Sequence, residues 1–185
     1  MSEPYIVYYL SDQLPELTHL VIGNSMPIRA FDYFAVKKHK TPIPVIANRG
    51  ASGIDGIIST GLGYARKNKD KTVIILGDYT FLYDLTALAL LRTCPNPVTI
   101  IIINNDGGGI FSHLPIAEDR ESLVPFFDAP HGFQFNDIAK FYNYYYESIK
   151  TIDEFKEKSK TWWSMTEHCL IEIAIDQDKN LDVYK

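Results

Sequence analysis

The chain has 185 residues, with 18 Lys and Arg against 23 Asp and Glu, which gives a formal net charge of −5 at pH 7. Hydrophobic residues make up 46% of the chain and charged residues 22%, a composition typical of a soluble globular protein. This length fits one domain. The lysines are scattered or confined to two short clusters, at 37–40 and 67–71, so we expect no nucleic-acid partner.

Cysteine usage and the N-terminal sequence indicate a cytoplasmic protein. Cys94 and Cys169 each stand alone, without a second thiol at metal-ligand spacing, which favours a reducing compartment. The N-terminus lacks the basic region of a signal peptide, and the longest apolar stretches are too short to span a bilayer. We therefore expect no membrane span, and we expect both cysteines to be buried.

Short runs of β-branched residues alternate with helical patterns along the chain. Most of the strand candidates are apolar on both faces, as in a parallel sheet covered by helices. The predicted fold class is α/β, with a parallel β-sheet flanked by helices on both faces in one domain. In chain order we predict a helix at 3–14, strands at 19–22 and 44–47, a helix after residue 52, a strand at 72–76, a helix at 82–91, a strand at 98–103, helices at 135–142 and 151–165, and a strand at 170–175. Thr151, with Glu154 three residues later, predicts a capping box at the start of the helix 151–165.

The segment 104–132 is too long and irregular for a plain connection, and loops of this length are usually functional or mobile. His113 and His131 lie in it without a partner at ligand or triad spacing, so we assign them no catalytic role. The aromatic runs 144–146 and 162–163 are interpreted as core or interface.

Two polar side chains follow neighbouring strands of the predicted sheet. Asp78 comes just after the strand 72–76, and Asn105 follows the strand 98–103. Parallel strands end at one edge of a sheet, where ligands bind in open α/β folds. A carboxylate, an amide oxygen and the carbonyl of the flexible Gly107 suit Mg²⁺. Each side chain alone is better explained by a helix cap or a turn, but the pair at this spacing favours a metal site.

A second cluster follows the strand 44–47. Ser52, with Asp55 three residues later, predicts the start of a helix whose free N–H groups bind a phosphate. The glycines in this helix predict that a ligand or the sheet approaches it closely; they are Gly53, Gly56, Gly61 and Gly63.

Two arginines follow the strands 19–22 and 44–47. Arg29 and Arg49 are expected to face one crevice, where two guanidinium groups suit small carboxylates. Each arginine alone is better explained by a surface ion pair.

Four blocks of the sequence carry a family resemblance. They are GNSMPIRAFD from Gly23, ANRGASGIDGIISTGLGYA from Ala47, GDYTFLYDLTALALL from Gly77 and NNDGGGIFSHLP from Asn104. Gly77-Asp78, with Asn105 following at a distance, resembles the diphosphate-binding signature of thiamine-diphosphate enzymes. The four blocks in this order are similar to the family of 2-succinyl-5-enolpyruvyl-6-hydroxy-3-cyclohexene-1-carboxylate synthases of menaquinone biosynthesis, over nearly the whole chain.

This resemblance implies thiamine diphosphate and Mg²⁺ or Mn²⁺ as cofactors, with the metal held by Asp78, Asn105 and the carbonyl of Gly107. It also implies that Ile54 is the apolar support of the bent cofactor. The implied cofactor-binding residues are Ser52, Gly53, Ile54, Gly77, Asp78, Tyr79, Asn105, Gly107 and Ile110. The implied substrate-binding residues are Asn24, Ser25, Arg29, Arg49, Phe111 and Leu114. Tyr79 departs from the family, which has a small or aliphatic residue there.

The resemblance also implies an activity. Members of the family decarboxylate 2-oxoglutarate and add the succinyl carbanion equivalent to isochorismate. Residues 1–185 match only their pyrophosphate-binding domain, so the pyrimidine-binding domain, with its activating glutamate, and the central domain are missing from the match. We therefore expect no catalytic residue in this chain and no turnover by the chain alone, which is an excised domain or a truncated gene product.

In the family a pyrimidine-binding domain of a second subunit completes the site, which implies a homodimer or homotetramer. Two alternatives stay open: the cofactor domain of another thiamine-diphosphate-dependent 2-oxo acid lyase or carboligase, and a non-catalytic assembly module.

Overall fold

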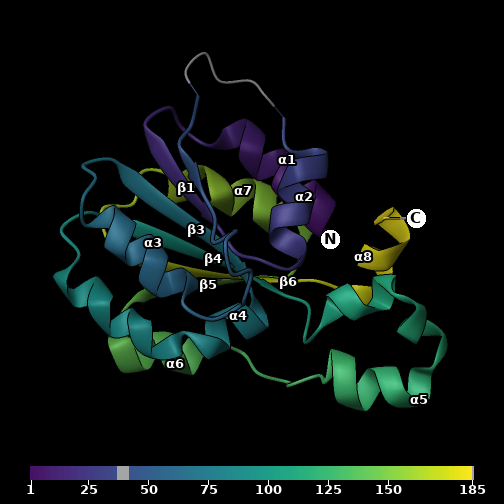
Figure 1. Cartoon of the computed structure of the whole chain (residues 1–185). Helices are drawn as coiled ribbons and strands as arrows, with labels where there is room; N and C mark the ends of the chain where they lie inside the picture. Colours follow the sequence, from purple (N-terminus) through teal and green to yellow (C-terminus); the bar gives the residue numbers. More distant parts are fainter. Residues whose placement is uncertain (37–41, 185) are drawn as a thin grey trace.

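Six parallel strands form one sheet, in the order β2-β1-β3-β4-β6-β5 (Figure 1). The computed structural model describes residues 1–36 and 42–184, so the first lysine cluster lies outside the described residues. The parallel pairing of all neighbouring strands confirms the predicted α/β fold class. The strands are β1 (Thr18–Ile22), β2 (Val45–Ile46), β3 (Lys71–Gly77), β4 (Val98–Asn104), β5 (Tyr145–Ile149) and β6 (Cys169–Ala174).

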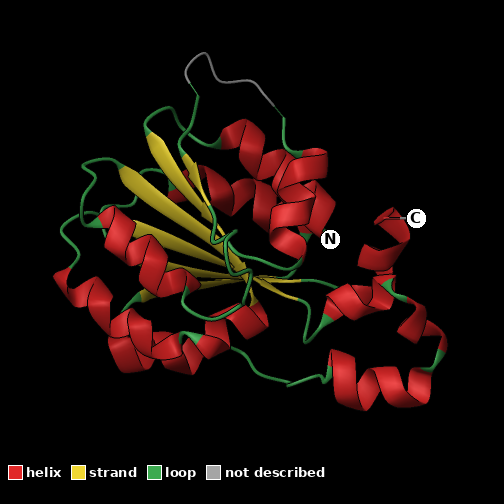
Figure 2. Ribbon diagram, in the orientation of Figure 1, coloured by secondary structure: helices red, strands yellow, loops and turns green. Residues whose placement is uncertain are grey.

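Helices cover both faces of the sheet (Figure 2). One face carries α1 (Glu3–Gln13), α2 (Met26–Phe34) and α7 (Ile152–Trp162). The other face carries α3 (Ile57–Ala65), α4 (Asp78–Tyr83), the 3₁₀ helix η1 (Leu85–Thr93) and α6 (Asn136–Tyr142). None of the helices within the described residues is long and apolar enough to cross a membrane.

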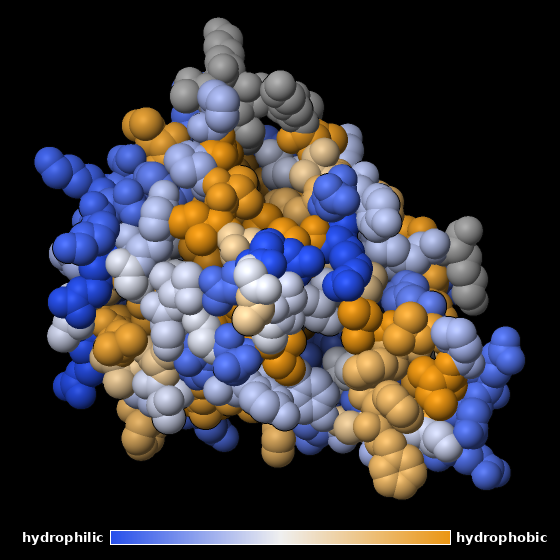
Figure 3. All heavy atoms as spheres, viewed as in Figure 1, coloured by the Kyte–Doolittle hydropathy of each residue, from blue (hydrophilic) through white to orange (hydrophobic). Residues whose placement is uncertain are grey.

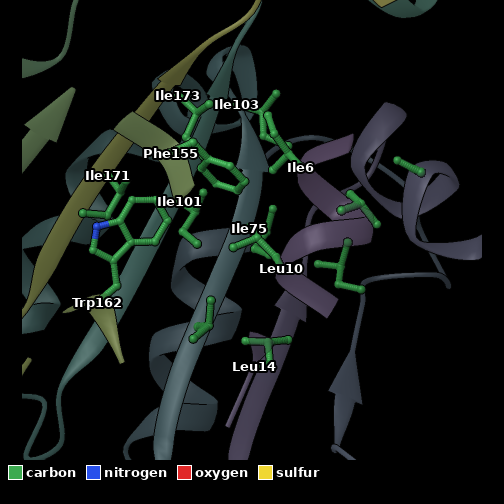
Figure 4. Close-up of a cluster of buried hydrophobic side chains, with 14 of the residues drawn as sticks. Ile6, Leu10, Leu14, Ile75, Ile101, Ile103, Phe155, Trp162, Ile171 and Ile173 are labelled. Carbon is green, nitrogen blue, oxygen red and sulfur yellow. The ribbon is translucent and has the colours of Figure 1, made fainter. Parts of the chain in front are cut away.

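The two central strands β3 and β4 are buried on both sides. Ile75 and Ile101 pack with Phe155 and Trp162 on the α7 side (Figure 4), whereas Ile74 packs with the helices on the opposite face. Burying one such side chain stabilises the fold by about 1.5–3 kcal/mol. Both cysteines are free and buried, as expected.

The capping box predicted for α7 is present. The N–H of Glu154 donates to Oγ1 of Thr151, and the N–H of Thr151 donates back to Oε2 of Glu154, both at 3.2 Å. At the other end, Nζ of Lys71 donates to the carbonyl oxygens of Trp162 (2.6 Å) and Met165 (3.2 Å). This contact joins the end of α7 to the start of β3.

Two elements differ from the prediction. The edge strand β5 was not predicted, because its side chains are half-buried and show no clear apolar alternation. The prediction of one continuous helix at 82–91 was wrong, because α4 ends at Tyr83 and η1 begins at Leu85. Between them, the carboxylate of Asp84 accepts hydrogen bonds from the N–H (2.7 Å) and the hydroxyl (2.9 Å) of Ser59 and so caps α3.

Much of the segment 104–132 is helical. It contains η2 (Gly109–His113), η3 (Pro115–Glu118), α5 (Arg120–Leu123) and the π-helical turn η4 (Val124–Asp128), and it stands away from the sheet near α8 (Gln177–Tyr184) (Figure 1). Val124, Phe126 and Phe127 are exposed on it, and Figure 3 shows apolar surface over this part of the molecule.

The base of this excursion is closed by hydrogen bonds. Oδ1 of Asp106 accepts from the N–H groups of His131 (3.1 Å) and Gly132 (2.6 Å). The N–H of Gly108 donates to the carbonyl of Asp128 at 2.7 Å. The two ends of the segment therefore lie together at the carboxyl end of β4.

Candidate functional site

A cavity of about 340 Å³ opens at the carboxyl ends of β3 and β4, a size within the usual range for small-molecule sites. α4 begins directly after β3, and the glycine-rich turn at 106–109 follows β4. The cavity is lined by most of the predicted cofactor-binding residues, namely Ile54, Gly77, Asp78, Tyr79, Asn105, Gly107 and Ile110, and by Ser25 and Phe111 of the predicted substrate pocket.

The predicted metal ligands meet in this cavity. Asp78 is 2% exposed, and its Oδ1 and Oδ2 accept hydrogen bonds from the N–H groups of Tyr79 (2.7 Å) and Gly107 (3.0 Å). One terminal atom of the Asn105 amide lies 3.0 Å from the carbonyl oxygen of Gly107 and 3.1 Å from Oδ2 of Asp78. The fold thus brings a carboxylate, an amide and a carbonyl together.

This arrangement fits a hard cation. With its nitrogen at the shared position, the Asn105 amide donates to both neighbouring oxygens. With its oxygen there, three oxygens meet, and neighbouring ligands of octahedral Mg²⁺ are about 3 Å apart when each metal–oxygen bond is about 2.1 Å. The separations found match that spacing, so the donor set and its geometry suit Mg²⁺.

Gly107 allows the turn to close against Asp78. Its φ is +148°, and a Cβ placed on it would overlap the carbonyl oxygen of Asp128. A residue with a side chain is therefore excluded at this position.

His131 is a site residue that the sequence reasoning missed. Its side chain is 5% exposed, with Nε2 3.3 Å from Oδ2 of Asp78 and Nδ1 3.4 Å from Oδ1 of Asp106. The expectation that it has no partner was wrong, because these partners are distant along the chain and the closed base of the excursion brings them together. The hydrogen bond with Asp78 raises the pKa of His131, against the opposing effect of burial. In contrast, the His113 ring packs edge-on against Tyr184.

The predicted phosphate-binding helix start is wrong in its details. α3 begins at Ile57, with Gly56 as its N-cap at φ +69°, so Ser52 and Asp55 do not cap it. Asp84 already accepts from the Ser59 N–H in the first turn. Ser52 and Gly53 lie outside the walls of the cavity, because the chain turns before the helix starts and the Gly53 carbonyl instead accepts a hydrogen bond from Asn24 (2.6 Å).

The glycines of this region predicted a close approach by a ligand or by the sheet. Within α3, the sheet makes such an approach at Gly61 but not at Gly63. A Cβ on Gly61 would lie 2.6 Å from Cδ1 of Ile74 in β3, whereas nothing among the described residues lies within 4 Å of one on Gly63. Gly53 and Gly56 precede the helix. Packing against β3 therefore accounts for Gly61.

Arg29 and Arg49 line a second cavity of about 490 Å³, as the prediction of a shared crevice requires. Nη1 of Arg29 donates to the carbonyl of Ser25 at 2.7 Å, and Nη1 of Arg49 donates to Oδ1 of Asn24 at 2.9 Å. Ser25 lines the first cavity, so its hydrogen bond with Arg29 connects the wall of the first cavity to a residue of the second. Leu114, another predicted substrate residue, is 48% exposed and lines neither cavity.

The first cavity is acidic. Glu3 and Asp78 line it, and none of the described residues in its wall is Lys or Arg. Burial raises the pKa of Glu3 to about 7, against the lowering effect of hydrogen bonds with Asn180 and Tyr184. An anionic ligand therefore requires a cation to bind here.

Comparisons with known proteins agree with this fold and site. Residues 25–173 match the family described as thiamine pyrophosphate enzyme, C-terminal TPP binding domain. The fold is shared with benzoylformate decarboxylase from Polynucleobacter necessarius (TM-score 0.78, 19% identity, 94% of this chain and 33% of that chain). It is also shared with a putative thiamin diphosphate-dependent enzyme from Mycobacterium smegmatis (TM-score 0.73, 18% identity, 94% and 32%). The chain belongs to the family of C-terminal TPP-binding domains of thiamine pyrophosphate enzymes.

Curated relatives confirm the more specific resemblance. The 2-succinyl-5-enolpyruvyl-6-hydroxy-3-cyclohexene-1-carboxylate synthase of Rubrobacter xylanophilus is 38% identical over 185 residues, which cover 100% of this chain and 32% of the relative. The synthase of the same name from Roseiflexus castenholzii is 40% identical, over 97% of this chain and 32% of the relative. The chain thus spans about a third of the length of the curated relatives it matches.

Proposed function

We propose that this chain is the cofactor-binding domain of a thiamine-diphosphate-dependent 2-succinyl-5-enolpyruvyl-6-hydroxy-3-cyclohexene-1-carboxylate synthase. The observation that carries the proposal is the meeting of Asp78, Asn105 and the Gly107 carbonyl at the spacing of cation ligands. The family match and the similarity to the synthases support it.

In this proposal Asp78, Asn105 and the Gly107 carbonyl hold Mg²⁺ or Mn²⁺, and the cation neutralises the diphosphate in an otherwise acidic cavity. Bound thiamine diphosphate supplies an electron sink for decarboxylation. Ile54 and Ile110, in the same wall, provide apolar surface for the organic part of the cofactor. Ile54 is the residue we assign to supporting its bent form.

We assign substrate recognition to the second cavity. The hydrogen bonds of Arg29 and Arg49 use Nη1 of each side chain, and the remaining guanidinium N–H groups are donors suited to carboxylates. The substrates we propose, 2-oxoglutarate and isochorismate, both carry carboxylates. The proposed substrate-binding set also includes Asn24, which is bonded to Arg49, and Ser25 and Phe111 in the wall of the first cavity.

The proposal extends to assembly. The pyrimidine-binding domain of a second subunit would complete the site and supply the activating glutamate, in a homo-oligomer located in the cytoplasm. No catalytic residue is assigned within residues 1–185, and the chain alone is proposed to be inactive.

The experiment is a calorimetric titration of thiamine diphosphate into the chain, with and without Mg²⁺. We expect binding that requires Mg²⁺ and is lost in Asp78→Asn. Asp70→Asn is the matched control, because Asp70 immediately precedes β3 and so lies at the end of that strand opposite Asp78. Mg²⁺-independent binding, or equal binding by the Asp78 variant, would contradict the proposed metal site.

A second titration tests the substrate class. With thiamine diphosphate and Mg²⁺ present, we expect 2-oxoglutarate to bind more tightly than pyruvate, and we expect Arg29→Gln to remove the difference. Arg66→Gln is the control, because Arg66 bonds to Thr93 away from both cavities. A preference for pyruvate would instead favour another lyase or carboligase of 2-oxo acids.

A further inference from the structure

We propose that His131 is a positioning residue that fixes the carboxylate of Asp78 in the metal site. This inference rests on the proposed function, because it concerns the same site. It assigns a role to a side chain that touches a ligand of the metal and is not itself one of the three proposed ligands.

The hydrogen bonds of the imidazole define its tautomer. The backbone N–H of Phe133 donates to Nδ1 of His131 at 2.9 Å, so Nδ1 carries the lone pair and the proton of the neutral ring is on Nε2. Nε2 faces Oδ2 of Asp78 at 3.3 Å, and both side chains are at most 5% exposed. The buried Nε2 thus lies beside the carboxylate at ion-pair distance, and it has no hydrogen-bond partner among the described residues.

Aromatic rings and the backbone hold the imidazole in this orientation. Phe133 stacks on it, with ring centroids 5.3 Å apart and planes 17° apart, and Tyr79 packs edge-on at 5.5 Å. Asp106 holds the backbone N–H of His131 itself. The ring therefore reaches Asp78 from a fixed support.

The carboxylate is surrounded by N–H groups on the protein side. Oδ1 faces the N–H of Tyr79, and Oδ2 faces the N–H of Gly107 and Nε2 of His131. These groups restrict rotation of the carboxylate, whose Oδ2 also lies 3.1 Å from the Asn105 amide. Outer-shell partners of this kind typically account for 10–100-fold in metal affinity.

Two variants separate the donor from the ring. His131→Phe keeps an aromatic ring between Tyr79 and Phe133 but removes the N–H aimed at Asp78. His131→Gln removes the ring but retains a side-chain N–H donor. Both lose the acceptor for the Phe133 N–H, so the difference between them isolates the donor. His113→Leu is the control, because His113 is an exposed histidine of the same segment that packs against Tyr184.

The experiment is a titration of each chain with Mn²⁺ alone, with the free ion followed by electron paramagnetic resonance, and with thermal unfolding to show that each variant is folded. We expect His131→Phe to weaken Mn²⁺ binding about 10–100-fold, and His131→Gln and His113→Leu to stay within a few-fold of wild type. Equal affinities for wild type and His131→Phe, or weakening in Gln but not in Phe, would overturn the inference. Absence of Mn²⁺ binding by the wild-type chain would instead reject the proposed metal site itself.

Discussion

The hydroxyl of Tyr184 donates to Oε2 of Glu3 across 3.4 Å, so that α8 contacts a buried carboxyl group in the cavity wall. Asn180 accepts from the backbone N–H of Glu3 at 2.7 Å, one helical turn away. Through these contacts α8 holds Glu3 of α1 in the cavity wall, and burial raises the pKa of this acid to about 7.

Stability should depend on pH through Glu3. Its pKa is about 7 in the folded chain against 4.5 ordinarily, so the folded chain holds a proton that the unfolded chain releases between these values. The stability contributed by protonated Glu3 is complete below pH 4.5 and is lost as the pH rises to about 7. The shift corresponds to about 3 kcal/mol.

Urea unfolding of wild type and Glu3→Gln over this pH range is the measurement. We expect the free energy of unfolding of wild type to fall relative to the variant as the pH rises, and then to level off. Parallel curves would show that Glu3 does not titrate between folded and unfolded states as we infer.

Gly107→Ala should impair the metal site. The added Cβ would overlap the Asp128 carbonyl, and φ is +148°, so the backbone must move at a cost of about 1–3 kcal/mol. We expect Mn²⁺ affinity to fall together with the unfolding midpoint. Gly63→Ala is the control, because it lies in α3 with open space around it and should gain up to about 1 kcal/mol. Unchanged Mn²⁺ binding by Gly107→Ala would contradict the role of this turn.

Tyr79→Phe should loosen the closed excursion. The Tyr79 hydroxyl donates to the carbonyl of Ala129, and removing it costs about 1 kcal/mol. We expect faster hydrogen exchange at amides 124–133, with the core strands unchanged. Tyr83→Phe is the control, because Tyr83 is 68% exposed. Equal exchange in both variants would show that the hydroxyl does not hold the segment.

Glu172→Gln should destabilise the chain by about 1–3 kcal/mol. Its buried carboxylate accepts hydrogen bonds from Nδ2 of Asn104 (2.7 Å), the N–H of Phe135 (2.9 Å) and the hydroxyl of Tyr146. In the variant, the glutamine NH₂ group replaces one carboxylate oxygen, so that one of these three donors would face another donor. Chemical unfolding measures the loss, and the exposed Glu157→Gln should change stability little. If Glu172→Gln left the free energy of unfolding unchanged, the network would tolerate an unpaired donor.

The sequence predicted the parts of the fold that repeat locally. Continuous apolar runs identified the buried strands, and Thr151 with Glu154 identified the start of α7, because these signals depend on neighbours in the chain. The edge strand β5 and the break at Asp84 were missed, since partial burial and a contact with Ser59 leave no local pattern.

The residues of the candidate site were predicted or missed for similar reasons. Asp78, Asn105 and Gly107 were predicted because topology alone brings the ends of adjacent strands together. His131 was missed, since it reaches Asp78 through the folded base of a long excursion. The helix start predicted at Ser52 was wrong, because the start of α3 depends on Gly56 and Asp84 rather than on a capping pattern.

The hydrogen bonds that close the base of the 104–132 excursion separate its interior from the folding of the sheet. Its ends are held by Asp106 and Gly108 whatever lies between them, and doubling the length of a flexible loop costs only about 0.6 kcal/mol in closure entropy. Insertions and replacements between these anchors should therefore reduce the stability of the fold only slightly. A scaffold of this kind would allow new pockets to form beside the proposed metal site.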